Sequence, residues 1–184
     1  DIFSTTELIE KSYLKKGDFF KLLTNEINEN ILKDNYNYTF KVGEHIISKP
    51  VIVPAGYNLV VNKGTTLKMT EESFIMVEDG SIKFQGTVDE PIEIKSLEKK
   101  LSWKGIYINS NFNKDNISIV NHVNISGISY FDNGIIQLTG GLNFINSNVR
   151  ISNSKIENSF SEDAINVVNS QFNISSSEFN NSMS

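Results

Sequence analysis

The chain has few of the side chains on which disulfide, thiol and metal chemistry depend. Its 184 residues include no cysteine, two histidines and three prolines. The lack of cysteine excludes disulfides, thiolate metal ligands and thiol nucleophiles. The two histidines, His45 and His122, lie far apart in the sequence and do not have metal-ligand spacing. We therefore expect no metal site and no cofactor.

Long apolar segments and excess positive charge are missing as well. No segment reaches the roughly 18 consecutive apolar residues of a transmembrane helix, so we expect no membrane span. The formal net charge is −5, whereas a nucleic-acid-binding protein carries a basic face; nucleic acid is therefore not an expected partner. A hydrophobic content of 39% with 21% charged residues is typical of a folded chain.

The most informative feature that is present is a repeat near the C-terminus. Residues 142–159 align with residues 165–182 at a constant offset of 23. Apolar positions of one segment meet apolar positions of the other, and Asn146–Ser147 meets Asn169–Ser170. A fixed period of about 20 to 50 residues predicts a solenoid. Apolar and polar residues alternate within each repeat, which predicts that the repeating units are β-strands.

Each repeat contains three short strands, separated by two-residue Asn-Ser-like turns and one longer loop. Strands that bend at such corners trace a coil, and successive coils pair in parallel about 4.8 Å apart. Asparagine suits the corners because its amide tolerates the left-handed backbone and bonds to nearby backbone groups. We therefore expect Asn146 and Asn169, and likewise Ser147 and Ser170, to stack as a structural ladder along the coil axis.

The N-terminal part of the chain has a different period. Residues 4–33 carry apolar side chains at helical spacing, and Asp18 is placed to cap a second helix. From Phe40 the period changes to two, so we predict an α-helical N-terminal cap at residues 1–39 and a parallel β-helix at residues 40–184. No matching cap follows the last repeat. We therefore expect this β-helix to be truncated or open at its C-terminal end, where end-to-end self-association would cover it.

These features resemble the right-handed parallel β-helix proteins of the pectate-lyase-like superfamily. The resemblance rests on the corner residues Asn146, Asn153 and Asn169, on the segment Glu162–Ile165 and on the segment Trp103–Ile106. Within that superfamily the chain is similar to uncharacterised repeat proteins of bacterial surfaces. The resemblance implies an all-β, right-handed coil and an extracellular or cell-surface location.

Three carboxylates are candidate catalytic residues. Asp132, Glu162 and Asp163 occupy comparable loop positions just before a strand, where stacked coils would bring them together. Glycoside hydrolases use such carboxyl groups as acid and base or nucleophile, and the resemblance implies that a lyase would add Ca²⁺ and an Arg or Lys base. Arg150, the only arginine, is expected to point outward opposite Asn173, which does not suit a base. The alternative is that the three carboxylates lie in exposed loops and serve solubility.

Aromatic side chains supply a second kind of candidate site. Trp103, Tyr107 and Tyr130 are candidate ligand-binding residues, because exposed rings on a sheet hold sugars. The alternative is core packing, since an inward aromatic at Trp103 would fit the start of its strand. Ile145 and Val168 form an apolar pair that alternation directs outward, which predicts a covered face, a partner contact or a bent corner.

Together these observations favour a non-catalytic extracellular or cell-surface module that recognises a glycan or a protein, or that serves as a scaffold. The first alternative is a polysaccharide lyase or glycoside hydrolase of the superfamily that the chain resembles. The second alternative is a purely structural stalk or assembly element. An enzyme requires the candidate carboxylates to converge, a glycan binder requires exposed aromatic residues in a row, and a stalk requires neither. The fold alone does not decide between them.

Overall fold

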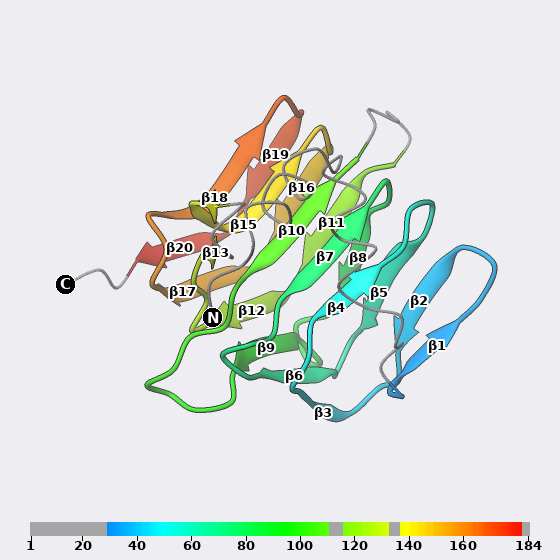
Figure 1. Cartoon of the computed structure of the whole chain (residues 1–184), viewed down its shortest axis with the longest axis horizontal. Helices are drawn as coiled ribbons and strands as arrows, with labels where there is room; N and C mark the ends of the chain where they lie inside the picture. The colour runs from blue at the N-terminus through cyan, green and yellow to red at the C-terminus, as the bar shows by residue number, and fades with distance from the viewer. Residues whose placement is uncertain (1–28, 111–115, 133–136, 182–184) are drawn as a thin grey trace, which may run out of the picture.

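The described part of the chain is a solenoid of short β-strands. The structure is a computed structural model that describes residues 29–110, 116–132 and 137–181. Within these ranges the regular elements are β-strands, and successive coils lie side by side from the N-terminal to the C-terminal end of the solenoid (Figure 1). No helix in this part of the chain is long and apolar enough to cross a membrane. The predicted parallel β-solenoid is confirmed.

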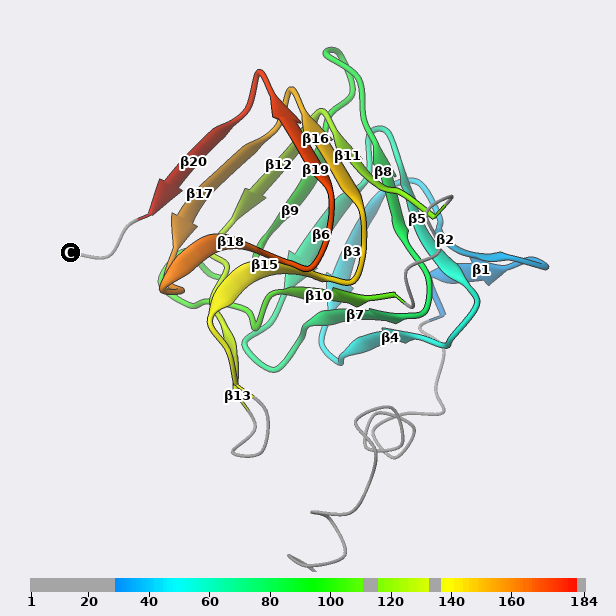
Figure 2. The same cartoon turned by 90° about the horizontal axis from the view of Figure 1, so that it is seen from above.

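Three sheets form the walls of the solenoid, and a coil passes from sheet A to sheet B to sheet C. Sheet A contains β1 (Ile31–Lys33), β2 (Asn37–Phe40), β5 (Asn58–Asn62), β8 (Ile82–Gln85), β11 (Ser118–Asn121), β16 (Val149–Ser152) and β19 (Phe172–Ser175). Sheet B contains β3 (Glu44–Ile47), β6 (Thr66–Met69), β9 (Ile92–Ser96), β12 (Val123–Ser126), β17 (Lys155–Ser159) and β20 (Glu178–Asn181). Sheet C contains β4 (Val51–Val53), β7 (Ile75–Glu78), β10 (Ile106–Asn109), β15 (Gly140–Ile145) and β18 (Asp163–Val168). Seen along the axis, the sheets are three sides of a triangle (Figure 2).

The first strand differs from the parallel strands that follow. β1 runs antiparallel to β2, and Ile31 pairs with Phe40. The prediction of helix over residues 4–33 is therefore wrong for Ile31–Lys33. Ile31 fits a helical pattern, but tertiary pairing places it in a sheet and leaves it only 9% exposed. The predicted cap up to residue 28 lies outside the described residues.

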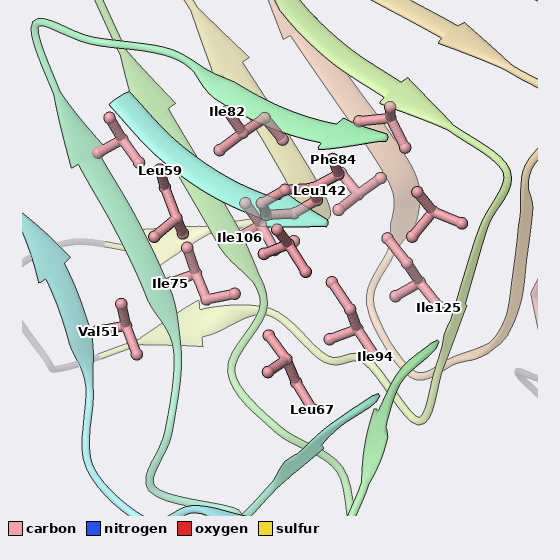
Figure 3. Packing of buried hydrophobic residues seen from close by; sticks show 14 of the residues in the cluster. Val51, Leu59, Leu67, Ile75, Ile82, Phe84, Ile94, Ile106, Ile125 and Leu142 are labelled. Atoms are coloured by element: carbon pink, nitrogen blue, oxygen red, sulfur yellow. The ribbon is translucent and has the colours of Figure 1, made fainter. Parts of the chain in front are cut away.

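Inward side chains form apolar columns along the axis. In sheet C, Ile75 pairs with Ile106, and Ile106 pairs with Leu142. All three side chains are buried, and Figure 3 shows them meeting side chains from the other two sheets in the interior of the coil. One coil alone would expose these side chains, so each coil is stabilised by the neighbour on either side.

The corners are narrow because their residues adopt the left-handed backbone. Between sheets A and B, His122, Asn153 and Ser176 have φ angles of 49°, 49° and 48°. Between sheets C and A, Asn146 and Asn169 have φ angles of 50° and 51°. A non-glycine residue adopts this conformation at a cost, which asparagine reduces through local hydrogen bonds. The corner position of His122 explains this histidine without a catalytic role.

The predicted ladder is present at the corner between sheets C and A. The Nδ2 group of Asn169 donates a hydrogen bond to Oδ1 of Asn146 at 2.9 Å. The backbone N–H of Ser147 donates to Oγ of Ser170 at 2.7 Å. These bonds join equivalent residues of consecutive coils, so they hold the coils in register.

Candidate functional surfaces

The three candidate catalytic carboxylates lie on two different elements. Asp132 lies on β13 (Phe131–Asp132), which pairs antiparallel with β14 (Gln137–Leu138) in a hairpin that projects from sheet C (Figure 2). Glu162 immediately precedes β18, and Asp163 is its first residue. All three are exposed. Among the residues that the structure describes, no group of three or more histidine, aspartate and glutamate side chains could hold a metal ion. Catalysis by these residues stays a prediction.

The three candidate aromatic residues differ sharply in exposure. Trp103 is fully buried, and its indole Nε1 donates to the backbone oxygen of Ser126 at 3.0 Å. The core-packing alternative therefore describes Trp103, because a buried ring presents no face to a ligand. Tyr107 is 2% exposed, whereas Tyr130 is 40% exposed. Of the three, only Tyr130 has a surface that a ligand can reach, so no row of exposed rings forms from them.

A small apolar cluster on the outer face of sheet C explains Tyr107. The cluster consists of Phe74, Met76, Tyr107, Phe131 and Leu138. Two of its members come from the β13–β14 hairpin, and the rings of Phe74 and Phe131 lie 4.8 Å apart, edge to face. Burial, together with the Glu78 carboxylate, raises the pKa of the Tyr107 phenol, which therefore stays protonated. The hairpin thus acts as a cover for this face of the sheet.

The same cluster accounts for one of the two outward apolar residues. Ile145 is half-buried and packs against the cluster. Of the three predicted explanations for this residue, the covered face is therefore the one that applies. Its register partner in the next coil, Val168, is 43% exposed. The apolar row on sheet C therefore extends beyond its cover toward the C-terminal end.

One outward row of sheet B is polar along the length of the solenoid. Register places one row of side chains across successive coils: Glu44, Thr66, Glu93, Asn124, Lys155 and Glu178. Neighbouring members interact, since Nδ2 of Asn124 donates to the Glu93 carboxylate at 2.6 Å. Lys155 pairs with Glu157 at 2.7 Å, and this hydrogen-bonded ion pair raises the pKa of Lys155. This face therefore presents hydrogen-bonding groups at the regular spacing of the coils.

A shallow, open groove lies where this face meets the corner between sheets A and B, near the C-terminal end. Its volume is about 570 Å³, and it is lined by Asn124, Asn153, Ser154, Lys155, Ser176, Ser177 and Glu178. Every lining residue is polar, and the groove contains one lysine and one glutamate. The sequence analysis did not single out these residues as a site. The offset of 23 already places Lys155 over Glu178, whereas the pairing of Asn124 with Lys155, at an offset of 31, comes from the register of sheet B.

Two further basic residues, Arg150 and His45, lie on sheets A and B, and Arg150 points outward as the alternation predicts. Arg150 is exposed on the outer face of sheet A, and its neighbours are Ile119 and Asn173. His45 is held by a hydrogen bond of 2.6 Å between its Nε2 and the backbone oxygen of Lys41. Neither arrangement provides a carboxylate partner in register, so neither residue adds a catalytic pair to the surface.

Comparison of the chain with protein-family models, curated proteins and solved structures finds no match.

Proposed function

We propose that the chain is a non-catalytic recognition module that binds a polysaccharide along the outer face of sheet B, through hydrogen bonds in place of the row of exposed aromatic rings that was expected of a glycan binder. The observation that carries this proposal is the groove whose seven lining residues are all polar. Amide, hydroxyl, ammonium and carboxylate groups pair with the hydroxyl groups of sugars, each of which donates and accepts hydrogen bonds. The row from Glu44 to Glu178 continues the same chemistry across the coils, which suits an extended chain rather than a compact ligand.

The charge of the groove favours a neutral polysaccharide. Lys155 has Glu157 within 2.7 Å and Glu178 as its register partner, so its positive charge is offset by carboxylates. A polyanion needs unpaired cations to replace its counterions, and a net charge of −5 opposes its approach. The proposal needs no cofactor, and Ca²⁺ would enter only if the chain were a lyase.

Three finer statements belong to the same proposal. The coil is right-handed, because crossover connections between parallel strands of one sheet have that hand in nearly every protein. The module belongs to the pectate-lyase-like superfamily and works outside the cell or on a bacterial surface. The support for both is the resemblance in the corner residues and in the segments Glu162–Ile165 and Trp103–Ile106.

A glycan array combined with assays for reducing ends and unsaturated products tests the proposal. The groove variant is Asn124→Ala/Lys155→Ala, and the matched control is Arg150→Ala, which removes an exposed cation from sheet A. Binding of neutral glycans without turnover, lost in the groove variant and kept in the control, is the expected result. If no glycan on the array binds and a protein partner does, the ligand of the module is a protein rather than a polysaccharide.

The carboxylates supply the opposite outcome. Turnover of any polysaccharide by the wild-type chain, abolished in Asp132→Ala/Asp163→Ala, would make the chain a lyase or hydrolase and overturn the proposal. Silence in every assay would leave the structural stalk as the better account.

A further inference from the structure

The amide side chains of the sheet B groove are oriented by hydrogen bonds within the protein. The Nδ2 group of Asn124 donates to the Glu93 carboxylate at 2.6 Å, and Nδ2 of Asn153 donates to Oδ1 of Asn121 at 3.1 Å. Each bond fixes which end of its amide is the nitrogen. The Oδ1 atoms of Asn124 and Asn153 accept no hydrogen bond from the residues that the structure describes, so both are acceptors that a ligand can use.

Two serine hydroxyls of the groove already use their protons. Oγ of Ser154 donates to the backbone oxygen of Ser152 at 2.7 Å, and Oγ of Ser177 donates to that of Ser175 at 2.8 Å. A hydroxyl group has a single proton to donate. Neither serine can therefore donate to a ligand without breaking a bond that holds its own turn.

The groove and its border carry more carboxylate than ammonium groups. Nζ of Lys155 lies 2.7 Å from the Glu157 carboxylate, and Glu178 is the register partner of Lys155. Glu157 and, to a smaller extent, Glu178 raise the pKa of Lys155, so this surface stabilises a positive charge. Glu93 and Lys95 lie on β9, in the coil before Asn124. Together, three carboxylates surround two ammonium groups.

Spare acceptors and an excess of carboxylates favour a ligand that donates hydrogen bonds. We propose that the groove binds a polysaccharide whose sugars carry unsubstituted amino groups. An ammonium group has three donors and no acceptor, which matches Oδ1 of Asn124, Oδ1 of Asn153 and the Glu178 carboxylate. Its hydrogen bonds are charge-assisted and therefore stronger than those of a sugar hydroxyl. The inference rests on the proposed function and narrows its ligand, because the sugars are uncharged apart from these amino groups.

Two related kinds of sugar fit the same groove less well. An acetylated amino group has no charge and a single N–H donor, and it adds a carbonyl acceptor that the engaged donors of the groove serve poorly. A carboxylated sugar brings a negative charge toward Glu157 and Glu178, which like-charge repulsion opposes. The groove therefore distinguishes an amine from its acetylated form as well as from an acid.

Three oligosaccharides of equal length and identical β-1,4 linkage test the inference, because they differ only in the substituent at one ring position. These are the oligomers of glucosamine, N-acetylglucosamine and glucose, and their affinities for the full chain are measured by isothermal titration calorimetry. The glucosamine oligomer should bind about tenfold more tightly than either of the others, since several amines contribute and each exposed ion pair contributes little.

A charge-removing variant locates the preference in the groove. Glu178→Gln keeps the size and an acceptor oxygen but removes the charge, so it should reduce the preference for the glucosamine oligomer about two- to fourfold. The matched control is Glu71→Gln, which removes an exposed carboxylate beyond the end of β6 and outside the groove. The control should leave the preference unchanged.

The contrary results separate this inference from the proposed function. Equal affinities for the three oligomers, or tighter binding of the acetylated one, would overturn the inference and leave the proposed function intact. The inference would also be wrong if Glu178→Gln and Glu71→Gln reduced the preference equally, because the amine would then respond to the net charge of the chain. Binding of another glycan on the array, with none of the three oligomers bound, would have the same meaning. If no glycan binds at all, the proposed function fails together with the inference.

Discussion

Ile151 and Ile174 have the same position in consecutive coils and differ in burial, so each is the control for the other. They pair directly in sheet A, but Ile151 has no exposed surface and Ile174 is 38% exposed. Both are predicted to destabilise the chain when truncated to alanine. Among the described residues a coil lies on each side of Ile151 and on only one side of Ile174, so the two losses should differ.

The magnitudes follow from the buried surface. Truncation of Ile151 removes about three carbon groups at ~0.8 kcal/mol each and leaves a cavity that adds to the cost, so we expect a loss of about 3–4 kcal/mol. Truncation of Ile174 removes the same groups, but only roughly three-fifths of this side chain is buried, compared with all of Ile151. No closed cavity forms there because the site opens to solvent, and we expect a loss of about 1–1.5 kcal/mol.

Urea unfolding measures both losses. Trp103 is the only tryptophan and is fully buried, so its fluorescence reports the loss of the core, and far-UV circular dichroism reports the strands. The predicted difference between the two variants is about 2 kcal/mol. Equal losses for Ile151→Ala and Ile174→Ala would contradict the difference in burial, because they would mean that the last coil is as well covered as the coil before it.

Three further predictions concern the corners and the N-terminal hairpin. Gly80→Ala should cost about 3 kcal/mol or more in the same urea assay, because the new Cβ would lie 1.9 Å from the backbone oxygen of Tyr57. A cost below that of Gly56→Ala, where the added carbon meets open space and only the φ of +86° adds strain, would contradict the packing. Asn146→Ala should cost about 2–3 kcal/mol, from the left-handed backbone and the lost ladder bonds; Asn146→Gly should cost less, and the reverse order would rule out backbone strain. The Asp34 carboxylate accepts from the N–H groups of Tyr36 and Asn37, and these bonds hold its pKa below the ordinary 3.8. A carboxylate whose pKa is lower in the folded than in the unfolded chain stabilises the fold at a pH above the unfolded pKa, and this stabilisation is lost as the pH falls through the folded pKa. Asp34→Ala should therefore speed amide exchange of β1 at neutral pH, and the difference from wild type should vanish as the pH falls below 3.8. A difference that does not depend on pH would show that the Asp34 carboxylate does not stabilise this turn.

The sequence was sufficient for those parts of the fold that local rules decide. The offset of the repeat placed Asn146 over Asn169 because a corner of two residues needs a left-handed backbone in every coil. Alternation also directed Arg150 outward correctly. The position of Ile31 was not predicted, because its spacing fits a helix and only pairing with Phe40, across a turn, places it in a strand.

The candidate site was harder to predict because it depends on coils of unequal length. Asn124 pairs with Lys155, and Lys155 pairs with Glu178, so the first step is longer than the second. The longer coil carries the β13–β14 hairpin, which covers Tyr107. Whether an outward aromatic residue is exposed or buried depends on whether a hairpin such as β13–β14 covers it. Alternation within the strand does not predict such a hairpin. Register between coils, rather than pattern within them, was the missing signal.

The parallel stacking of coils in a fixed register can be tested directly by cross-linking, because the chain contains no cysteine. Arg150 and Asn173 are register partners on exposed positions, and neighbouring strands lie about 4.8 Å apart. Arg150→Cys/Asn173→Cys should therefore form an intrachain disulfide under mild oxidation, identified by mass spectrometry. Arg150→Cys/Ser175→Cys should not, because two residues along the strand raise the separation to about 8 Å, beyond disulfide reach. Preferential cross-linking of the second pair would contradict the register.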